Sequence, residues 1–518
     1  MLFLRLTKYL CGSRWGMAVL ASLALVTAPA FACDTIPAGQ TIWVRLTAPV
    51  STYTAKPGDV IQGVLTQSIE CDNETEFPIG AHAIGVVRSV RKVGWGIRHE
   101  TAALTIEFTQ LLRSDGPPIV ISARLTEVEN AREQVSSKGV VQGIRSSDTP
   151  EGRINSRLGH LPTWNPYSDL GLIVYKATFP IFPEPEIYLP AGSDLRLKLE
   201  KAIVAPPPLP QPPMDEAAYA ADDFEWQEFA RTIPERTTTE SMVNADLINL
   251  VFVGSQEQVY TAFHNAGWVN SDVFTRHSFL RNFYAFLNNS GYAQAPMRSF
   301  LLDGKPADMN WQKSLNSYAR RDHLRMWAWP DAPRSQTVWL SSSTHDTGAA
   351  LSIKHHEFVH HISPDIDEER SKVIRDLTAA GCVRSVHLVS RRGVPTLTEN
   401  ATGDPVRTDG SLAVVELKDC ASPVPELASV STPAPYKPGN KVFRYFRRQI
   451  LTFRSDIWRA NILYGAYDLG HMSITALKHH NSMTTFHREQ AERAAESARA
   501  AEQGSNESAG TASLPGSN

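Results

Sequence analysis

The proline-rich segment "APPPLPQPPMDE", Ala205–Glu216, constrains the fold more than any other feature of the chain. Such a sequence favours extended polyproline II and cannot contribute to a packed core, so it divides the chain into an N-terminal and a C-terminal part. The chain has 518 residues, more than a single hydrophobic core usually serves. We therefore predict at least two domains, joined by a proline-rich linker and spacer over residues 205–243.

Before the linker, apolar and polar residues alternate with a period of two. Ile42, Val44 and Leu46 alternate with polar neighbours, and the segments "DVIQGVLTQSIE", "AIGVVRSVRKV", "AALTIEFTQLL" and "PIVISARLTEV" come next, between turn residues. This pattern is typical of half-buried antiparallel strands. We predict an all-β domain over residues 33–204, either a small antiparallel barrel or a sandwich.

The β domain carries an internal repeat. The stretch "IPAGQTIWVRL" from Ile36 recurs as "LPAGSDLRLKL" from Leu189, and a shorter version, "FPIGAHAIGVV", begins at Phe77. In each copy Pro and Gly set a tight turn that precedes a strand. Such turns are common in β proteins, so the short copy can be a chance occurrence. Chance explains the two long copies less easily. We predict that the last copy supplies a closing strand beside the first.

After the linker the pattern predicts a mixed domain. "DLINLVFVGS" is typical of a short strand, and Ser255 with Gln258 forms a capping box for a helix that stops at Gly267. A second helix, "TRHSFLRNFYAFLNN", precedes four β-like segments, a helix from about Asp365 to Ala380 and two final strands. We predict an α+β domain with a mostly antiparallel sheet over residues 244–425.

The N-terminus has the pattern of a secretory signal peptide over residues 1–32. Arg5, Lys8 and Arg14 precede a short apolar run that begins at Met17 and ends in Ala30-Phe31-Ala32. A basic region, an apolar region and an A-x-A site predict cleavage before Cys33. We therefore expect the protein to be exported, to the periplasm or cell envelope.

The cysteines suit an oxidising compartment. Removal of the signal peptide leaves an even set of four, which are Cys33, Cys71, Cys382 and Cys420. They fall into two separated pairs, so we predict one disulfide in each domain, Cys33–Cys71 and Cys382–Cys420. Lipidation of Cys33 is the alternative, although Ala30 rather than Leu stands three residues before the cut.

A basic amphipathic helical region is predicted over residues 426–489, before a tail over 490–518 that we expect to be disordered. Its apolar stripe is formed by Phe443, Phe446, Ile450, Phe453 and Ile457, with Arg444, Arg447, Arg448, Arg454 and Arg459 around it. The stripe could pack on the neighbouring domain. Alternatively, the Arg444–Arg459 helix could lie on an anionic membrane surface. The formal charge of −3 argues against nucleic acid as the main partner.

Several blocks of the second domain resemble the LssY-type C-terminal domain of bacterial envelope proteins. They are "NLVFVGSQEQVYTAFHNAGW", "LLDGKPADMNWQKS", "RRDHLRMW", "TVWLSSSTHDTG" and "HHISPDIDEERSKVIRDLTAAGC", and the resemblance covers roughly residues 244–420. The β-domain block "VENAREQVSSKGVVQGIRSSDT" resembles regions that precede this domain in other exported proteins. The family has no established activity to carry over. Some members also contain DedA-like or phosphatidic-acid-phosphatase-like membrane domains; this sequence shows neither pattern, so a lipid-phosphatase function is not expected from the resemblance.

The resemblance places eight polar residues at motif positions, which are His323, Arg325, Thr344, Asp346, His361, Asp365, Asp367 and Arg370. On the predicted elements, His323 and Arg325 share one face of a strand. Thr344, Asp346 and His360 or His361 lie near turns and element ends. The first six could bind an anionic group or exchange protons. The alternative is a structural network of ion pairs.

One short stretch matches a zinc-protease pattern. His356-Glu357-Phe358-Val359-His360 reads H-E-x-x-H, which on a helix would put both histidines on one zinc and let the glutamate activate a water. With Asp376 as a third ligand, this would make a zinc metalloprotease.

The flanking sequence favours a hairpin over a helix at this stretch. Pro364 forbids a continuous helix, and Leu351–Lys354 alternates as a strand does. We therefore interpret the region as a strand from Ala350, a turn through Lys354–Glu357 and a returning strand Phe358–Ile362. The zincin geometry then disappears, and zinc is expected only in the alternative; no other cofactor is predicted.

Together these features predict an exported envelope protein with a binding or structural role and no established catalysis. A hydrolase that uses the His/Asp residues is the competing hypothesis, with the metalloprotease as its sharpest form.

Overall fold

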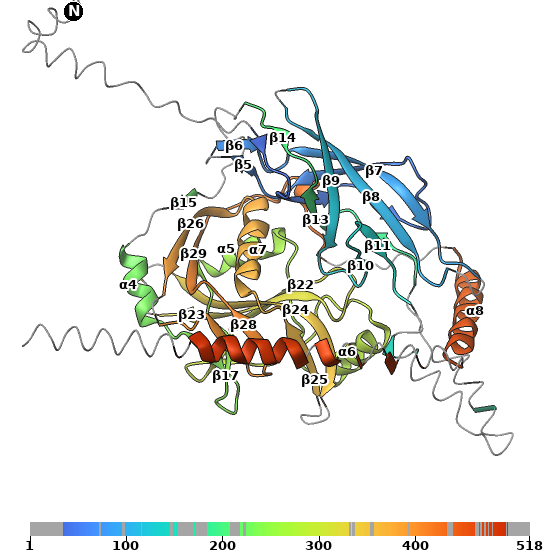
Figure 1. Ribbon diagram of the computed structural model, residues 1–518. Helices are drawn as coiled ribbons and strands as arrows, with labels where there is room; N and C mark the ends of the chain where they lie inside the picture. Colours follow the sequence, from blue (N-terminus) through green and yellow to red (C-terminus); the bar gives the residue numbers. More distant parts are fainter. Residues whose placement is uncertain are drawn as a thin grey trace, which may run out of the picture.

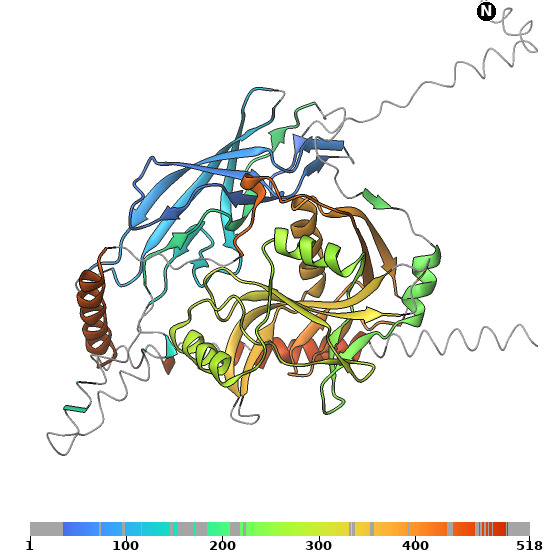
Figure 2. The same cartoon turned by 180° about the vertical axis from the view of Figure 1, so that it is seen from behind.

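The structure is a computed structural model in which a β-barrel lies against an α+β domain (Figure 1 and, from behind, Figure 2). It describes residues 35–495 except for 72–73, 96–98, 115, 146–148, 151, 153–169, 172–173, 175–183, 208–217, 221–223, 331–332, 334–336, 353–356, 392, 432–438, 461–465, 467–468, 471–472, 475, 479 and 494. The predicted signal peptide and Cys33 therefore lie outside the described residues, as does most of the predicted disordered tail.

Six of the described strands close an antiparallel barrel, in the order β8-β7-β4-β2-β13-β9 with β9 pairing back onto β8. Their bounds are β2 Thr41–Leu46, β4 Val60–Leu65, β7 His82–Arg91, β8 Ala103–Leu112, β9 Ile119–Val128 and β13 Asp194–Leu199. The alternating apolar residues fill the interior, where Ile42, Val44 and Leu46 are at most 1% exposed. The predicted all-β domain is confirmed as a barrel.

Short strands border the barrel. They are β1 Thr35–Ile36 with β14 Ile203–Val204, β3 Val50–Ser51 with β12 Tyr188–Leu189, β5 Ile69–Cys71 with β6 Glu74–Phe77, and β10 Gln134–Val135 with β11 Val140–Gln142. The first two pairs bring the start of the domain beside its end.

The three repeated P-x-G turns share one geometry. In each, the carbonyl of Pro accepts from the backbone N–H three residues on, in the pairs Gln40–Pro37, Ala81–Pro78 and Ser193–Pro190. The glycines Gly39, Gly80 and Gly192 have φ of 94°, 85° and 87°, which a residue with a Cβ rarely adopts. As predicted, the last copy closes beside the first, because β13 pairs with β2.

The α+β domain is built on a sheet of nine described strands, in the order β15-β26-β29-β18-β24-β23-β22-β19, with β25 paired to β24. Their bounds are β15 Ala218–Ala220, β18 Leu250–Val253, β19 Val269–Asn270, β22 Met309–Lys313, β23 Arg321–Trp329, β24 Val338–Ser352, β25 Glu357–Ile362, β26 Val383–Ser390 and β29 Ser411–Leu417. Only β15–β26 and β18–β29 pair in parallel among these strands. The mostly antiparallel prediction is confirmed.

Smaller sheets border this domain. One contains β16 Arg236–Thr238, β17 Asn244–Leu247, β20 Leu301–Leu302 and β21 Lys305–Pro306, and another contains β27 Leu397–Glu399 and β28 Pro405–Arg407. The 3₁₀ turn η3, Pro425–Leu427, comes after the last strand.

Helices cover both faces of the large sheet. On one face lie α5 Gln256–Asn265 and α7 Ile366–Ala379, and α4 Phe224–Thr232 packs on the other (Figure 1). The capping box of Ser255 and Gln258 forms as predicted, and Asp365 caps α7. The helix α6, Arg276–Asn288, lies at the edge of the domain. Trp226 of α4 is fully buried, so part of the range predicted as linker belongs to this core.

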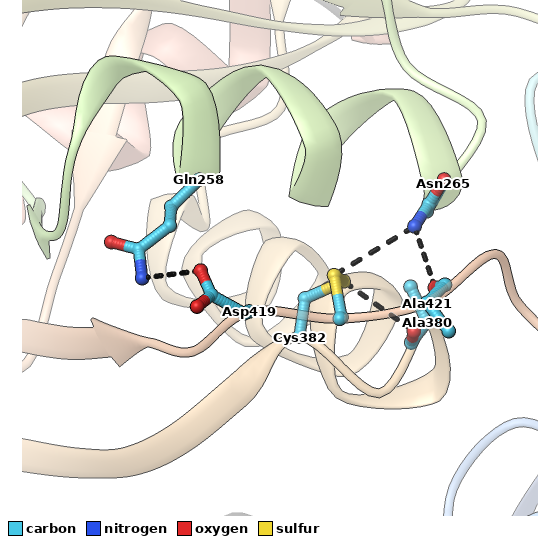
Figure 3. The surroundings of a disulfide bond; sticks show 7 residues. Gln258, Asn265, Ala380, Cys382, Asp419 and Ala421 are labelled. Atoms are coloured by element: carbon cyan, nitrogen blue, oxygen red, sulfur yellow. Dashed lines mark hydrogen bonds between the residues drawn. A yellow bond between two sulfur atoms is a disulfide. The ribbon is translucent and has the colours of Figure 1, made fainter.

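The predicted disulfide Cys382–Cys420 is present, with its sulfur atoms 2.02 Å apart. It joins the chain just after α7 to the chain just after β29, beside the C-terminal end of α5 (Figure 3). There the side chain of Asn265 donates to the carbonyl of Ala421 at 2.9 Å. The predicted partner of Cys71, Cys33, lies outside the described residues.

The helix α8, Lys441–Ala460, packs on the barrel through a mixed face. Arg447 is 5% exposed and its Nη2 lies 3.1 Å from Glu186 Oε1, while Leu451 joins the barrel core. Arg454 donates to a backbone carbonyl of the barrel at 2.6 Å. The contact face therefore differs from the apolar stripe that the sequence led us to consider for packing. No helix among the described residues is long and apolar enough to cross a membrane.

Residues 490–493, predicted to be disordered, continue a helix. Arg493 Nη2 lies 3.2 Å from Glu489 Oε1 one turn earlier, and its Nη1 donates to Thr396 Oγ1 at 3.1 Å. These contacts stabilise the last described turn of that helix.

Candidate functional site

Part of the predicted polar set forms a cluster across β23, β24 and β25. Strand register places Arg321 opposite Asp346 and His323 opposite Thr344. His323 Nε2 lies 3.0 Å from Thr344 Oγ1, and its Nδ1 lies 3.4 Å from Asp346 Oδ1. Arg321 Nε donates to Asp346 Oδ2 at 2.9 Å, and His360 Nδ1 lies 3.1 Å from the same oxygen. We call these five residues the buried cluster.

Burial decides the protonation of the buried cluster. It lowers the pKa of His323 to about 3, although the charge of Asp346 opposes this shift, and it also lowers the pKa of His360. Burial opposes ionisation of Asp346, but the two histidines and Arg321 bring its pKa below the usual range. His323, Thr344 and Asp346 are 6%, 3% and 0% exposed, so a substrate has no access to their polar atoms. The cluster holds three strands together.

The other predicted site residues lie elsewhere. Arg325 Nη1 donates to Asp246 Oδ2 at 3.1 Å. His361 points away from the buried cluster, and its Nδ1 lies 2.8 Å from Asp404 Oδ1. Asp365 accepts backbone hydrogen bonds from the first turn of α7 at 3.2 and 3.3 Å. The six candidate residues therefore occupy several separate environments.

The zinc-protease pattern falls on a hairpin. Ala349 of β24 is opposite His360, and Ser352 is opposite Glu357. His356 lies outside the described residues. Glu357 and His360 belong to one extended strand, so their backbones are not related by a helical turn. Residues 357–362 therefore lack the helical arrangement that the protease chemistry requires, in agreement with the hairpin interpretation.

The opposite face of β23 and β24 lines a pocket of about 220 Å³ between the two domains. His345 and Asp322 are cross-strand neighbours, and His345 Nδ1 lies 2.6 Å from Asp322 Oδ1. Glu369 of α7 completes a trio whose donor atoms all lie within 4.8 Å of one another. Among the described residues, this trio is the group that could hold a metal ion. Sequence patterns alone did not lead us to any of the three.

Charge is concentrated at this trio. Burial lowers the pKa of His345, but the hydrogen bond and charge of Asp322 outweigh it and raise the value to about 9. Burial and the neighbouring charge of Asp322 raise the pKa of Glu369 well above its usual range. Burial opposes ionisation of Asp322, but Lys372 and His345 lower its pKa. His345 and Asp322 therefore form an ion pair at neutral pH.

The barrel supplies the other wall of the pocket. Asn130 Nδ2 donates to Asp322 Oδ2 at 2.6 Å, and Lys372 Nζ donates to Glu129 Oε2 at 2.7 Å. Arg375 Nη2 donates to Glu129 Oε1, also at 2.7 Å. Glu129 and Asn130 come from the β-domain block "VENAREQ", which resembles regions that precede LssY-type domains. That block therefore contacts the second domain.

The family comparison now has a structural context. Residues 230–412 match the family model described as LssY C-terminus. The chain carries an LssY-like C-terminal domain. The match begins within α4, earlier than the start at residue 244 that we predicted from the sequence. All three members of the trio lie within the matched residues. The LssY-like domain thus supplies the trio, and the barrel covers it.

Comparisons with other proteins add little. No curated protein matches the chain at a significant level. Among solved structures, the chain is similar to ComB10 of the Com type IV secretion system of Helicobacter pylori, with 13% identity over 34% of this chain and 94% of that chain. The TM-score is 0.20, which is too low to carry an argument.

Two further motif residues have structural partners. Arg370 Nη2 donates to Asp409 Oδ2 at 2.7 Å, and Thr408 Oγ1 donates to Asp367 Oδ1 at 2.8 Å. These bonds fasten the start of α7 to the loop before β29. Asp367 and Arg370 therefore support the helix that carries Glu369.

Proposed function

We propose that the protein is exported to the bacterial cell envelope, where its role is to bind a small anionic ligand. The signal-peptide pattern of residues 1–32 supports export. The Cys382–Cys420 disulfide supports it independently, because such bonds persist in oxidising compartments and are rare in the cytosol. The hydrolase alternative has less support, because the buried cluster is closed to substrates.

Arg320 is the observation that carries the binding role. It lines the inter-domain pocket, is partly buried, and makes no ion pair with any other residue in the described part of the chain. The neighbouring cations are already paired: Lys372 and Arg375 with Glu129, and Arg196 with Glu368 at 2.6 Å. A guanidinium group binds carboxylate or phosphate through two parallel hydrogen bonds. Arg320 therefore offers a place for an acidic group.

The size of the pocket limits the ligand. Its volume of about 220 Å³ is below the roughly 300–1,000 Å³ of sites for drug-sized molecules. A small metabolite or a single acidic head group fits this volume, whereas a polymer would have to extend out of the pocket. Pockets between domains are common ligand sites, since both partners shape them.

Inorganic phosphate and succinate are suitable probes of this proposal. Calorimetric titration of the mature full-length chain should detect binding of at least one of them, and Arg320→Gln should abolish it. Arg231→Gln is the matched control, because Arg231 is an exposed arginine on α4, paired with Glu228 away from the pocket. The proposal fails if neither anion binds or if Arg320→Gln binds as the wild type does.

A second role, attachment to a membrane surface, is favoured by α8. Phe446 and Phe453 of its apolar stripe are 60% and 68% exposed, while Arg447 and Arg454 of the same helix face the barrel. Figure 1 shows α8 at the outer end of the barrel, away from the large sheet. We propose that this stripe rests in the interface of an anionic membrane.

Co-sedimentation with phosphatidylglycerol-containing vesicles tests the membrane role. The double variant Phe446→Ser and Phe453→Ser should lose most binding, because the stripe would no longer bury apolar area. Phe224→Ser is the control, since Phe224 is even more exposed, at 76%, but lies on α4. Equal sedimentation of all variants would contradict this role.

A further inference from the structure

We propose that Asp322, His345 and Glu369 bind one divalent transition-metal cation in the inter-domain pocket. Each comes from a different element, β23, β24 and α7, and all three line the pocket. Their donor atoms lie within 4.8 Å of one another, which is close enough for one ion to reach all three after small side-chain movements. Binding of the ion displaces the protons held by His345 and Glu369, as metal binding does at other sites with protonated ligands. This inference deepens the proposed function because it concerns the same pocket.

The fold presents these donors from rigid elements. Asp322 and His345 face each other across the β23–β24 ladder, so strand register alone sets their separation. Glu369 lies in the first turn of α7, behind the cap made by Asp365. Ser343 lies two residues before His345 on the same face of β24, and its hydroxyl donates to Glu369 Oε1 at 3.3 Å. Hydrogen bonds of this kind orient metal-binding carboxylates.

The two carboxylate oxygens of Asp322 have different partners. Oδ2 accepts from Asn130 at 2.6 Å and lies 3.4 Å from Lys372 Nζ. Oδ1 instead faces His345. The barrel and Lys372 thus hold the carboxylate through one oxygen and leave the other on the side of the remaining donors. Because Lys372 is positive, Oδ1 is the better ligand of the two for a cation.

Asn130 supplies a second, independent observation. It is 4% exposed and lines the pocket, and its side-chain Oδ1 has no hydrogen-bond partner among the described residues. A buried amide oxygen without a partner is costly, so native proteins usually supply a donor or a cation. The backbone of Asn130 is also held at φ 55°, in the left-handed region. This oxygen can ligate the cation or accept a hydrogen bond from a water bound to it.

The donor set indicates the class of cation. One imidazole and two carboxylates suit zinc or manganese, whereas calcium and magnesium sites consist of oxygen ligands alone. Three protein ligands beside an open pocket leave further positions for water or for a ligand. An anion held by Arg320 could therefore also bind the metal directly, which connects this inference to the proposed ligand.

Metal analysis of the mature full-length chain tests the site. After loading with zinc or manganese and dialysis, mass spectrometry of the metal should find about one equivalent per chain. Glu369→Gln preserves the side-chain volume and the acceptor for Ser343, and should lower affinity by at least the roughly 10–100-fold that loss of an outer-shell partner costs. Glu368→Gln is the matched control, because Glu368 is the preceding residue, lies near the pocket and is outside the trio.

A second pair of variants protects the test against misfolding. His345→Asn should also lose the metal, whereas His361→Asn, on the histidine-rich hairpin, should retain it. If His345→Asn does not fold, Glu369→Gln decides. The inference is overturned if the wild type binds neither metal, if Glu369→Gln binds as Glu368→Gln does, or if the metal is lost only in His360→Asn. The two proposals can be separated by measuring anion binding in the presence of EDTA. If phosphate or succinate still binds and Arg320→Gln abolishes that binding, the proposed function holds even where the metal site fails.

Discussion

Lys372 is buried where α7 meets the barrel, and three carboxylates share its ammonium group. Its Nζ lies 2.7 Å from Glu129 Oε2, 3.2 Å from Asp376 Oδ2 and 3.4 Å from Asp322 Oδ2. Burial disfavours the charge, but the attraction of Asp376, Glu129 and Asp322 outweighs it and raises the pKa of Lys372 well above its usual value. We predict that Lys372→Met destabilises the whole protein, although methionine is similar in length.

The magnitude depends on the groups that the substitution leaves behind. The three carboxylate side chains are 8%, 1% and 0% exposed, so water cannot replace the lost ammonium group. Glu129 keeps Arg375 and Asp322 keeps His345, while Asp376 keeps both Lys313 and Arg45. Removing one partner from a buried ion pair costs about 3–5 kcal/mol. We expect a loss in this range in the free energy of unfolding.

Urea denaturation of the full chain measures this loss. Lys305→Met, on an exposed strand end, is the control and should change stability by less than about 0.5 kcal/mol. Adding Glu129→Gln to Lys372→Met removes one of the stranded carboxylates, so the double variant should be more stable than the sum of the single effects by roughly 0.5–3 kcal/mol. A loss below about 1 kcal/mol for Lys372→Met would refute the reasoning.

Three further predictions concern single residues. His323 has a pKa of about 3 in the folded protein and about 6.5 in the unfolded chain, so the unfolded chain binds more protons between these values. The free energy of unfolding should therefore fall by up to about 1.4 kcal/mol per pH unit as the pH drops below about 6.5. Urea titrations between about pH 7 and pH 5 should show a smaller pH dependence for His323→Gln. Replacing Cys382 and Cys420 by alanine opens a loop of 38 residues and should cost about 2–4 kcal/mol by thermal unfolding; a change under about 1 kcal/mol would contradict this. Glu357→Gln should leave anion binding and any peptide cleavage nearly unchanged, whereas loss of a catalytic glutamate lowers cleavage by about 10²–10⁴-fold.

Local rules predicted much of the fold. Period-two alternation predicted the barrel strands, and the P-x-G repeat even predicted that the strand containing Leu195 would close beside the one containing Val44. The helix boundaries depend on side-chain caps at Ser255 and Asp365. These features depend on residues close in the chain, or on a repeat that marks partners, so the sequence contains them directly.

Non-local contacts explain the features that the sequence did not predict. The apolar stripe of α8 suggested packing, but the barrel offers Glu186 and backbone carbonyls instead, so Arg447 and Arg454 are buried and Phe446 is left in solvent. In the same way, the proline segment predicted a linker up to residue 243, yet α4 packs Trp226 into the sheet. No local pattern shows which surface a helix will meet.

The sequence "RDHLR" at the start of β23 shows why the candidate residues and the pocket residues lie on different faces. Alternate residues point to opposite faces, so Arg321 and His323 lie on one face and Asp322 on the other. On the first face, His360 of β25 contacts Asp346, and the buried cluster is closed to solvent. The second is covered by a different domain, and the pocket remains there.

Which face of β23 can bind a ligand therefore depends on the covering domain. Asp322 and Glu369 belong to the LssY-like domain, whereas Glu129 and Asn130, which complete the wall, belong to the barrel. An LssY-like domain joined to a different partner would keep its internal cluster, because that cluster needs no second domain. Its pocket would change, since the residues facing Asp322 would come from another fold. If the pocket binds a ligand as proposed, we expect exchange of the barrel to alter that binding while leaving the LssY-like core intact.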